Sequence, residues 1–93
     1  MGKAVLVNEK DNVVTLVSDV KKGEDVVFRI GSGTKQIKSD EDIPYGHKIA
    51  LSQIAKGSGI IKYGEAIGRA KSDIKAGHWV HTSNTDETYT PSR

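Results

Sequence analysis

The eight residues "DIKAGHWV" (73–80) follow a pattern that occurs four times in the chain. Each copy has an acid or amide first, a β-branched apolar residue second, a glycine fifth and Val or Ile eighth. The other copies are "DVKKGEDV" (19–26), "DIPYGHKI" (42–49) and "QIAKGSGI" (53–60). Because the spacing between copies is uneven, the pattern does not describe a solenoid array. It predicts four sharp corners within one small domain.

The residue types of the pattern explain why each copy should form a corner. A leading Asp can accept hydrogen bonds from backbone N–H groups two or three residues further on, as in an Asx-turn. The apolar residue would fill the core. The glycine can take the left-handed conformation before the chain enters the next strand. We therefore expect each corner to be closed by its own side chain.

The segments between the corners are rich in Val, Ile and Thr, which favour β-strands. Strands are predicted at residues 4–7, 13–17, 26–30, 34–38, 59–70 and 77–83. Only "KIALSQIAKG" (48–57) has apolar residues near helical spacing, followed by a glycine that can end a helix. The fold class is therefore expected to be mainly β, with bent hairpins and one short helix.

Length and composition indicate one small domain. Residues 1–84 are expected to form it, and the polar segment 85–93, which contains Pro91, is expected to be a flexible tail. With 93 residues, of which 35% are hydrophobic and 5% aromatic, the core should be thin and aliphatic. Such a domain has reason to bury surface against a partner, and a homo-oligomer is one form this can take.

Composition also excludes several classes of function. The chain has no cysteine, so it has no disulfide, thiolate ligand or cysteine nucleophile. Its 14 basic and 12 acidic residues are interspersed and aromatic residues are few, so we expect no nucleic-acid binding. No segment is apolar enough for a secretion signal or a membrane span. We therefore expect a cytoplasmic protein without membrane association.

Side chains able to carry chemistry follow the corner glycines. The second corner is followed by His47 and Lys48, and a glycine bend follows Lys62 and Tyr63. A cation, an imidazole and a phenol suit recognition of a polyol carboxylate. The alternative is structural: a solvated lysine, a tyrosine that covers a glycine, and a histidine that only packs. We expect the side chains of "GHK", "KYG" and "VH" to converge on one rim.

The last corner is followed by two histidines. Strand alternation places His78 and Val80 on one face, and Trp79, His81 and Ser83 on the other. The two imidazoles should therefore point apart, and no complete metal site is expected within this chain. His81 can still supply a single ligand to a metal site shared with another chain.

Four motifs together resemble a known family. They are "GHKIAL" (46–51), "IAKG" (54–57), "IKYGEAIGRA" (61–70) and "DIKAGHWVH" (73–81). The pattern is similar to the small N-terminal SAF-type domain of altronate and galactarate dehydratases, and to the related small subunit of sulfolactate sulfo-lyase. The resemblance implies a β-clip fold and a large catalytic dehydratase subunit as partner.

The resemblance also implies site residues and a cofactor. The implied roles are catalytic for His47 and His81, and substrate-binding for Lys48, Lys62, Tyr63 and Asn84. The family pattern H-V-H-x-H-N falls on Trp79, His81, Ser83 and Asn84, so only the middle histidine is kept. The isolated chain is expected to bind no cofactor, whereas the complete enzyme is expected to use Fe²⁺ or another divalent metal.

Two classes of function remain open on this resemblance. In the first, the chain is part of a hydro-lyase that dehydrates a sugar acid such as altronate or galactarate, or part of a sulfolactate sulfo-lyase. It would not be active alone. In the second, the chain is a non-catalytic module for carbohydrate binding or assembly, and its histidines are structural.

Overall fold

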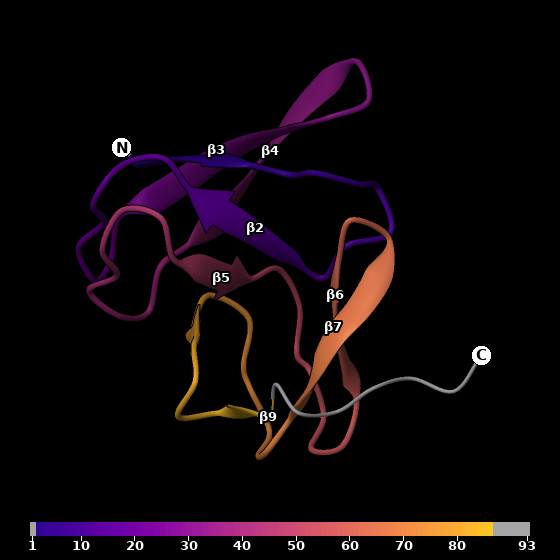
Figure 1. Ribbon diagram of the computed structural model, residues 1–93. Coiled ribbons are helices and arrows are strands. Elements are labelled where there is room, and N and C mark those ends of the chain that lie inside the picture. The colour runs from indigo at the N-terminus through magenta and orange to yellow at the C-terminus, as the bar shows by residue number, and fades with distance from the viewer. Residues whose placement is uncertain (1, 87–93) are drawn as a thin grey trace.

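Nine strands in two sheets make up residues 2–86, the part of the chain that the computed structural model describes (Figure 1). The sheets have the strand orders β4-β3-β1-β2-β5-β8 and β6-β7-β9. The strands are β1 (Gly2–Val5), β2 (Val13–Leu16), β3 (Asp25–Ile30), β4 (Gly33–Lys38), β5 (Lys48–Ala50), β6 (Gly59–Lys62), β7 (Glu65–Ala70), β8 (Trp79–Val80) and β9 (Thr85–Asp86). All neighbouring strands are antiparallel except β1 and β3. The mainly β fold class is confirmed.

The predicted helix over residues 48–57 is wrong, and residues 2–86 contain no helix. The first part of this segment is β5, which pairs with β2 on one side and β8 on the other. Ile54 then bridges to Ile74, and the chain turns at Gly57. The apolar residues that suggested one helical face are buried by strand pairing and a corner instead, because partners distant in sequence override local spacing.

The strand boundaries differ from the prediction in two places. The strand expected at 59–70 is divided into the β6–β7 hairpin, because the chain reverses at Tyr63 and Gly64. The strand expected at 77–83 is reduced to β8, which has two residues. Thr85 and Asp86, assigned by sequence to the tail, form β9 and pair with Ala70 and Arg69 of β7. The rest of the predicted tail, residues 87–93, lies outside the described residues.

All four corner glycines adopt the left-handed conformation that the repeated pattern predicts. The φ angles are +91° at Gly23, +86° at Gly46, +85° at Gly57 and +83° at Gly77. In each corner, the N–H after the glycine donates to the carbonyl oxygen two positions before the glycine, as from His47 to Pro44 at 3.3 Å. A left-handed glycine at the third position is the signature of a type II turn. The predicted corners are confirmed.

The corners are joined in pairs by short β-bridges. Val20 and Ile43 exchange two backbone hydrogen bonds of 2.9 and 2.8 Å, and Ile54 and Ile74 exchange two of 2.7 and 2.8 Å. The first corner therefore pairs with the second, and the third with the fourth. The β3–β4 hairpin connects the members of the first pair, and the β6–β7 hairpin connects those of the second.

The carboxylates of the pattern bond across each pair and not within their own corner, so that part of the prediction is wrong. Asp19 Oδ1 accepts from the Tyr45 amide and Asp42 Oδ1 from the Lys22 amide, both at 2.8 Å. In the second pair, Asp73 Oδ1 accepts from the Lys56 amide at 2.8 Å. Because paired corners run antiparallel, each carboxylate faces the turn of its partner. A corner is thus closed by the opposite corner.

Gln53→Asp is expected to raise the free energy of unfolding by about 1 kcal/mol. Gln53 occupies the position that Asp holds in the other three corners, and within residues 2–86 no hydrogen bond joins it to the Ala76 amide. A carboxylate one methylene shorter would accept that N–H, as Asp73 accepts the N–H of Lys56. Urea unfolding measures the change. Gln53→Glu adds the same charge on a longer side chain, and an equal gain there would contradict the explanation.

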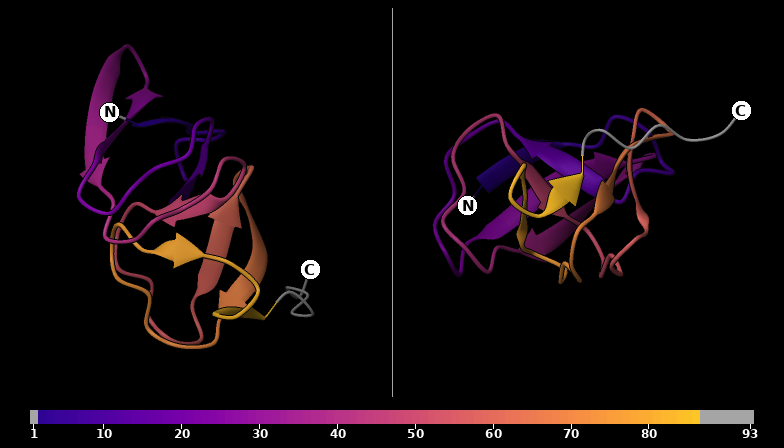
Figure 2. Two further views of the ribbon diagram at one scale, coloured as in Figure 1. Left: turned by 90° about the vertical axis from the view of Figure 1, so that its left-hand side faces the viewer. Right: turned by 60° about the horizontal axis from the view of Figure 1, so that its bottom comes forward.

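The core consists of two clusters on opposite faces of the β2–β5 pair. One contains Val13, Ala50, Ile54, Ile60, Ala70, Ile74 and Val80. The other contains Val14, Leu16, Val20, Val26, Phe28, Ile43 and Ile49. Consecutive residues of β2 and β5 alternate between the clusters, as strand geometry requires. Figure 2 shows the corresponding division between the indigo-to-magenta first half and the orange-to-yellow second half. Residues 2–86 include no helix able to cross a membrane.

Candidate functional site

The pairing of β5 with β8 brings an imidazole and an indole together. In the register of this pair, Ile49 faces Trp79, and His47 lies two residues before Ile49. The rings of His47 and Trp79 meet edge to face, with centroids 5.0 Å apart and an interplanar angle of 85°. The Trp79 Nε1–H donates a hydrogen bond of 3.2 Å to His47 Nδ1. Two motifs far apart in the sequence therefore form one site.

His81 also contacts the indole and completes a cluster of three rings. Its ring centroid lies 4.5 Å from that of Trp79, with an interplanar angle of 45°. The Ser83 hydroxyl lies 2.9 Å from His81 Nδ1. We call His47, Trp79 and His81 the ring cluster. Trp79, His81 and Ser83 are grouped as expected, but by the turn that follows β8 and not by alternation along a strand, because β8 ends at Val80.

Asn84 holds the loop that carries His81. Its Oδ1 accepts from the His81 amide at 2.9 Å, and its Nδ2 donates to the Trp79 carbonyl at 2.7 Å. The Thr85 hydroxyl also donates to Oδ1, at 3.2 Å. Because both polar atoms of the amide have partners within the chain, Asn84 positions His81 in this structure. A direct role in substrate binding stays a prediction from sequence.

His78 belongs to a different group of contacts. Its Nε2 lies 2.7 Å from Asp40 Oδ2, and its Nδ1 lies 3.3 Å from Glu41 Oε2. The same Glu41 oxygen accepts from the Trp79 amide at 2.9 Å. The imidazole therefore joins the last corner to the segment after β4, and its contacts are separate from those of His81. The expected separation of the two imidazoles agrees with this geometry.

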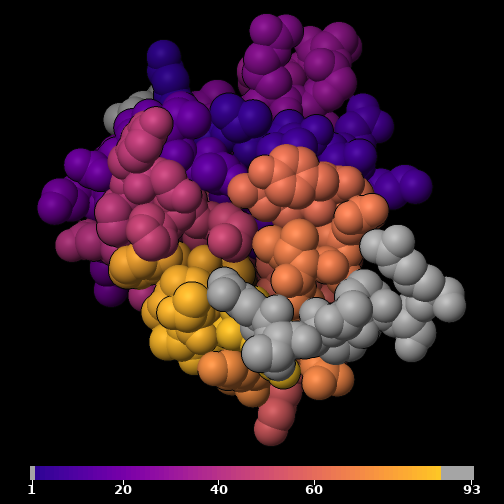
Figure 3. Space-filling view, in the orientation of Figure 1, coloured from indigo at the N-terminus to yellow at the C-terminus, as the bar shows by residue number. Residues whose placement is uncertain are grey.

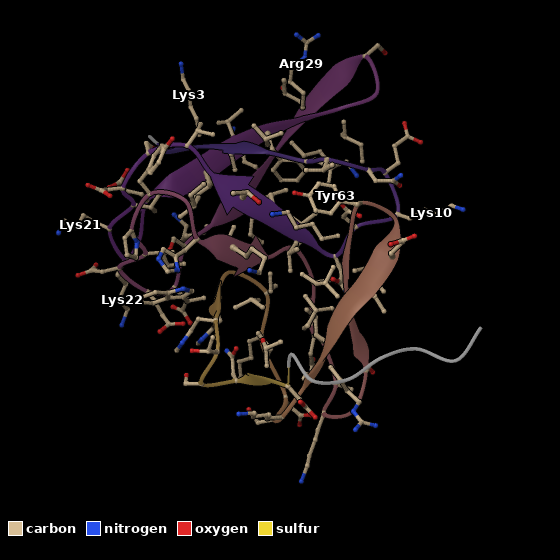
Figure 4. All side chains as sticks on the ribbon, in the orientation of Figure 1. Lys3, Lys10, Lys21, Lys22, Arg29 and Tyr63 are labelled. Atoms are coloured by element: carbon tan, nitrogen blue, oxygen red, sulfur yellow. The ribbon has the colours of Figure 1, made fainter. Side chains whose placement is uncertain are left out.

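Lys62 and Tyr63 are placed at the tip of the β6–β7 hairpin and have their own partners. Tyr63 has φ +58°, and its amide and that of Gly64 donate to the buried Asp11 carboxylate at 3.2 and 2.9 Å. Lys62 Nζ lies 5.1 Å from the Tyr63 ring centroid. Figure 4 shows Tyr63 near Lys10, on the side of the β1–β2 turn. The expected convergence on one rim holds for "GHK" and "VH", but the contacts of "KYG" lie elsewhere.

The ring cluster borders an open groove of about 340 Å³. Trp79 forms part of its wall, and the first corner pair supplies the rest: Asp19, Val20, Lys21, Asp42, Ile43 and Pro44. In Figure 3 the gold surface of β8 meets the pink surface around the second corner in this region. Lys48, which is half-buried at the start of β5, follows His47 directly. The site therefore combines imidazoles and an aromatic wall, with Lys48 next to His47 in the chain.

Sequence reasoning missed Trp79 and Asp11. The indole is the central contact of the ring cluster, and Asp11, which is 7% exposed, anchors the hairpin tip. For Trp79 a signal was present, because it occupies a position where the family pattern has histidine. For Asp11, the sequence indicated only a residue type that favours turns, placed between two predicted strands.

A comparison with protein families matches residues 2–88 to the altronate/galactarate dehydratase SAF domain. The chain belongs to this family. Among relatives, the altronate dehydratase of Bacillus subtilis is 38% identical over 85 residues, which cover 91% of this chain and 16% of that protein. The galactarate dehydratase (L-threo-forming) of Escherichia coli is 39% identical over 79 residues, covering 85% of this chain and 14% of that protein. The SAF domain therefore spans about one-sixth of these two enzymes.

A second kind of relative is much shorter. The (2R)-sulfolactate sulfo-lyase subunit alpha of Paracoccus pantotrophus is 43% identical over 49 residues, which cover 53% of this chain and 73% of that subunit. SAF domains of this family thus occur both within long dehydratase chains and in short subunits of lyases. The matched segments are thus parts of larger dehydratases or subunits of a lyase.

The SAF domain alone does not fit a metal centre. Over residues 2–86, no three His, Asp or Glu side chains converge as a metal site would require. His81 offers one imidazole, next to the hydroxyl of Ser83. The imidazoles of the ring cluster belong to no group of three such side chains among the described residues.

Proposed function

We propose that this SAF domain is the small subunit or domain of a hydro-lyase that dehydrates a sugar acid such as altronate or galactarate. The observation that carries the proposal is the ring cluster, in which β5–β8 pairing joins the family motif "GHK" to the last corner beside an open groove. Trp79 lines this groove, and the imidazoles that contact its ring can donate or accept protons and can orient a hydroxylated substrate.

The chemistry assigns different tasks to the side chains. Dehydration removes the proton α to the carboxylate, protonates the departing β-hydroxyl and develops negative charge on the carboxylate-derived enediolate. We assign His47 and His81 to proton handling or oxyanion stabilisation, and Lys48 to the substrate carboxylate. A divalent metal such as Fe²⁺ in the complete enzyme would help to stabilise that charge. His81 is the residue of this chain that we assign as a candidate ligand of that metal.

The hairpin tip has a different part in this proposal. Tyr63 is 61% exposed and holds a backbone conformation that is unfavourable for a tyrosine, with Asp11 fixing it. We assign Lys62 and Tyr63 to contact with the large catalytic chain, or with the part of the substrate that this chain holds. Because the active centre would be shared, the SAF domain is not active alone.

The test supplies the missing part in trans. The segment of Bacillus subtilis altronate dehydratase that matches this chain is deleted, and the remainder is mixed with this SAF domain. We expect dehydration of a sugar acid only when both parts are present. The relative's own segment, supplied in the same way, is the matched control. Activity of the remainder alone, or restoration by its own segment but not by this SAF domain, would overturn the proposal.

A sulfo-lyase is the second candidate, and one observation favours it. The sulfolactate sulfo-lyase relatives are themselves short subunits, of which the match covers 73% in one case. Adding (2R)-sulfolactate to the substrates, with the large subunit of that lyase as partner, separates the two activities. Restoration of sulfite release alone would assign this SAF domain to the sulfo-lyase.

A further inference from the structure

The hydrogen bond between Trp79 and His47 specifies where His47 carries its proton. An indole Nε1–H is only a donor, and imidazole nitrogens accept only when they are unprotonated. Because Trp79 Nε1 donates to His47 Nδ1 at 3.2 Å, Nδ1 has its lone pair directed at the indole. A neutral His47 must then carry its proton on Nε2, at the far side of the ring.

The indole that makes this bond is held on several sides. The Trp79 amide donates to Glu41 at 2.9 Å, and its carbonyl accepts from Asn84 at 2.7 Å. The ring packs against His81 and lies partly buried on the second core cluster. The donor therefore has a fixed place relative to β5, which carries His47 at its beginning. A donor fixed in this way can act on the tautomer of its acceptor.

We propose that Trp79 is a positioning residue that holds His47 as the Nε2–H tautomer, so that His47 presents a hydrogen-bond donor on its exposed side. A neutral imidazole that donates from Nε2 can stabilise a developing oxyanion. The same tautomer has no lone pair on Nε2, so this atom is neither a base nor a metal ligand. Within the proposed hydro-lyase, His47 therefore donates to the enediolate or the departing oxygen. This consequence rests on the proposed function, whereas the tautomer does not.

Nuclear magnetic resonance of the ¹⁵N-labelled full chain tests the tautomer without any substrate. At about pH 9, where histidines are neutral, we expect a scalar coupling across the hydrogen bond from Trp79 Nε1 to His47 Nδ1. The His47 Nδ1 shift should be that of an unprotonated nitrogen. Absence of the coupling, or a protonated Nδ1, would overturn the proposal. This readout is independent of enzyme activity.

The Trp79→Phe variant separates the donor from the packing. Phenylalanine keeps an aromatic ring but has no N–H, so the Nδ1–H tautomer of His47 should become several-fold more populated. His81 is the internal control, because it contacts the indole ring without accepting its hydrogen bond. Its tautomer should not change. Equal shifts at both histidines would indicate a general loosening and contradict the assignment.

Activity of the assembled enzyme then tests the donor role. His47→Gln keeps an N–H near the position of Nε2, so it should retain about ten-fold more kcat than His47→Ala. His47→Asn, with its amide at the position of Nδ1, should not. If the coupling is present but these variants are alike, the tautomer holds and the catalytic role fails. If the coupling is absent while His47→Ala is inactive, the proposed function survives without the tautomer.

Discussion

Gly77→Ala is expected to lower the free energy of unfolding by about 4 kcal/mol or more. Gly77 has φ +83°, where a Cβ costs about 1–2 kcal/mol. A Cβ there would also clash with the carbonyl oxygen of Lys38. Because the obstacle is backbone, the last corner and the end of β4 would have to separate. Urea unfolding followed by circular dichroism measures the loss.

Gly57→Ala is the matched control for this prediction. Gly57 has nearly the same backbone conformation, with φ +85°, but no atom lies within 4 Å of an added Cβ. We expect a loss of only about 1–2 kcal/mol, the cost of the conformation alone. The difference between the two variants isolates the close approach of the two segments. Equal losses would show that corner conformation, and not packing, governs stability.

His47→Ala is expected to reduce kcat/KM of the assembled hydro-lyase about 100-fold, and His81→Ala by about 10- to 100-fold. Both imidazoles contact Trp79, which lines the groove, and in the proposed reaction they would take part in proton transfer or oxyanion stabilisation. Steady-state kinetics of the complex made in trans gives both values. Removal of either side chain should lower kcat more than it raises KM.

His78→Ala is the control for His47→Ala and His81→Ala, because it also removes a histidine next to β8. Its imidazole contacts Asp40 and Glu41, outside the ring cluster, so kcat/KM should stay within about three-fold of the starting value. Unchanged kinetics in all three variants, with assembly intact, would identify a non-catalytic docking or carbohydrate-binding module. A loss of assembly in His47→Ala would place the ring cluster in the interface between the chains.

Local chemistry could predict the corners but not their pairing. The conformation of each corner glycine depends on local turn geometry, which the spacing of the repeated pattern indicates. All four glycines have the expected conformation. The bonds of Asp19 and Asp42 depend on which corner lies opposite, which no local pattern contains. The same reason explains the wrong helix, because Ile54 is buried by Ile74, twenty residues further on.

The candidate site could be predicted only in part, because its geometry also depends on contacts between residues distant in sequence. Motif resemblance indicated His47 and His81, and strand alternation grouped His81 with Trp79 and Ser83. The contact between His47 and Trp79 depends on the register of β5 with β8, which sequence alone did not provide. The place of Lys62 and Tyr63 depends on the anchor at Asp11, which fixes the hairpin tip beside another turn.

The reciprocal closure of the corners affects how the chain reaches its native state. The bonds that join the first pair span 26 and 20 residues. The amides of Lys22 and Tyr45 find their carboxylate partners only when the intervening hairpin has brought the other corner into place. A partly folded chain with one corner formed has only the turn's own hydrogen bonds, and loop-closure entropy must be overcome before the bonds to the opposite corner form. We therefore expect the two corners of the first pair to form together, and a substitution that removes one carboxylate to weaken the turn of the opposite corner.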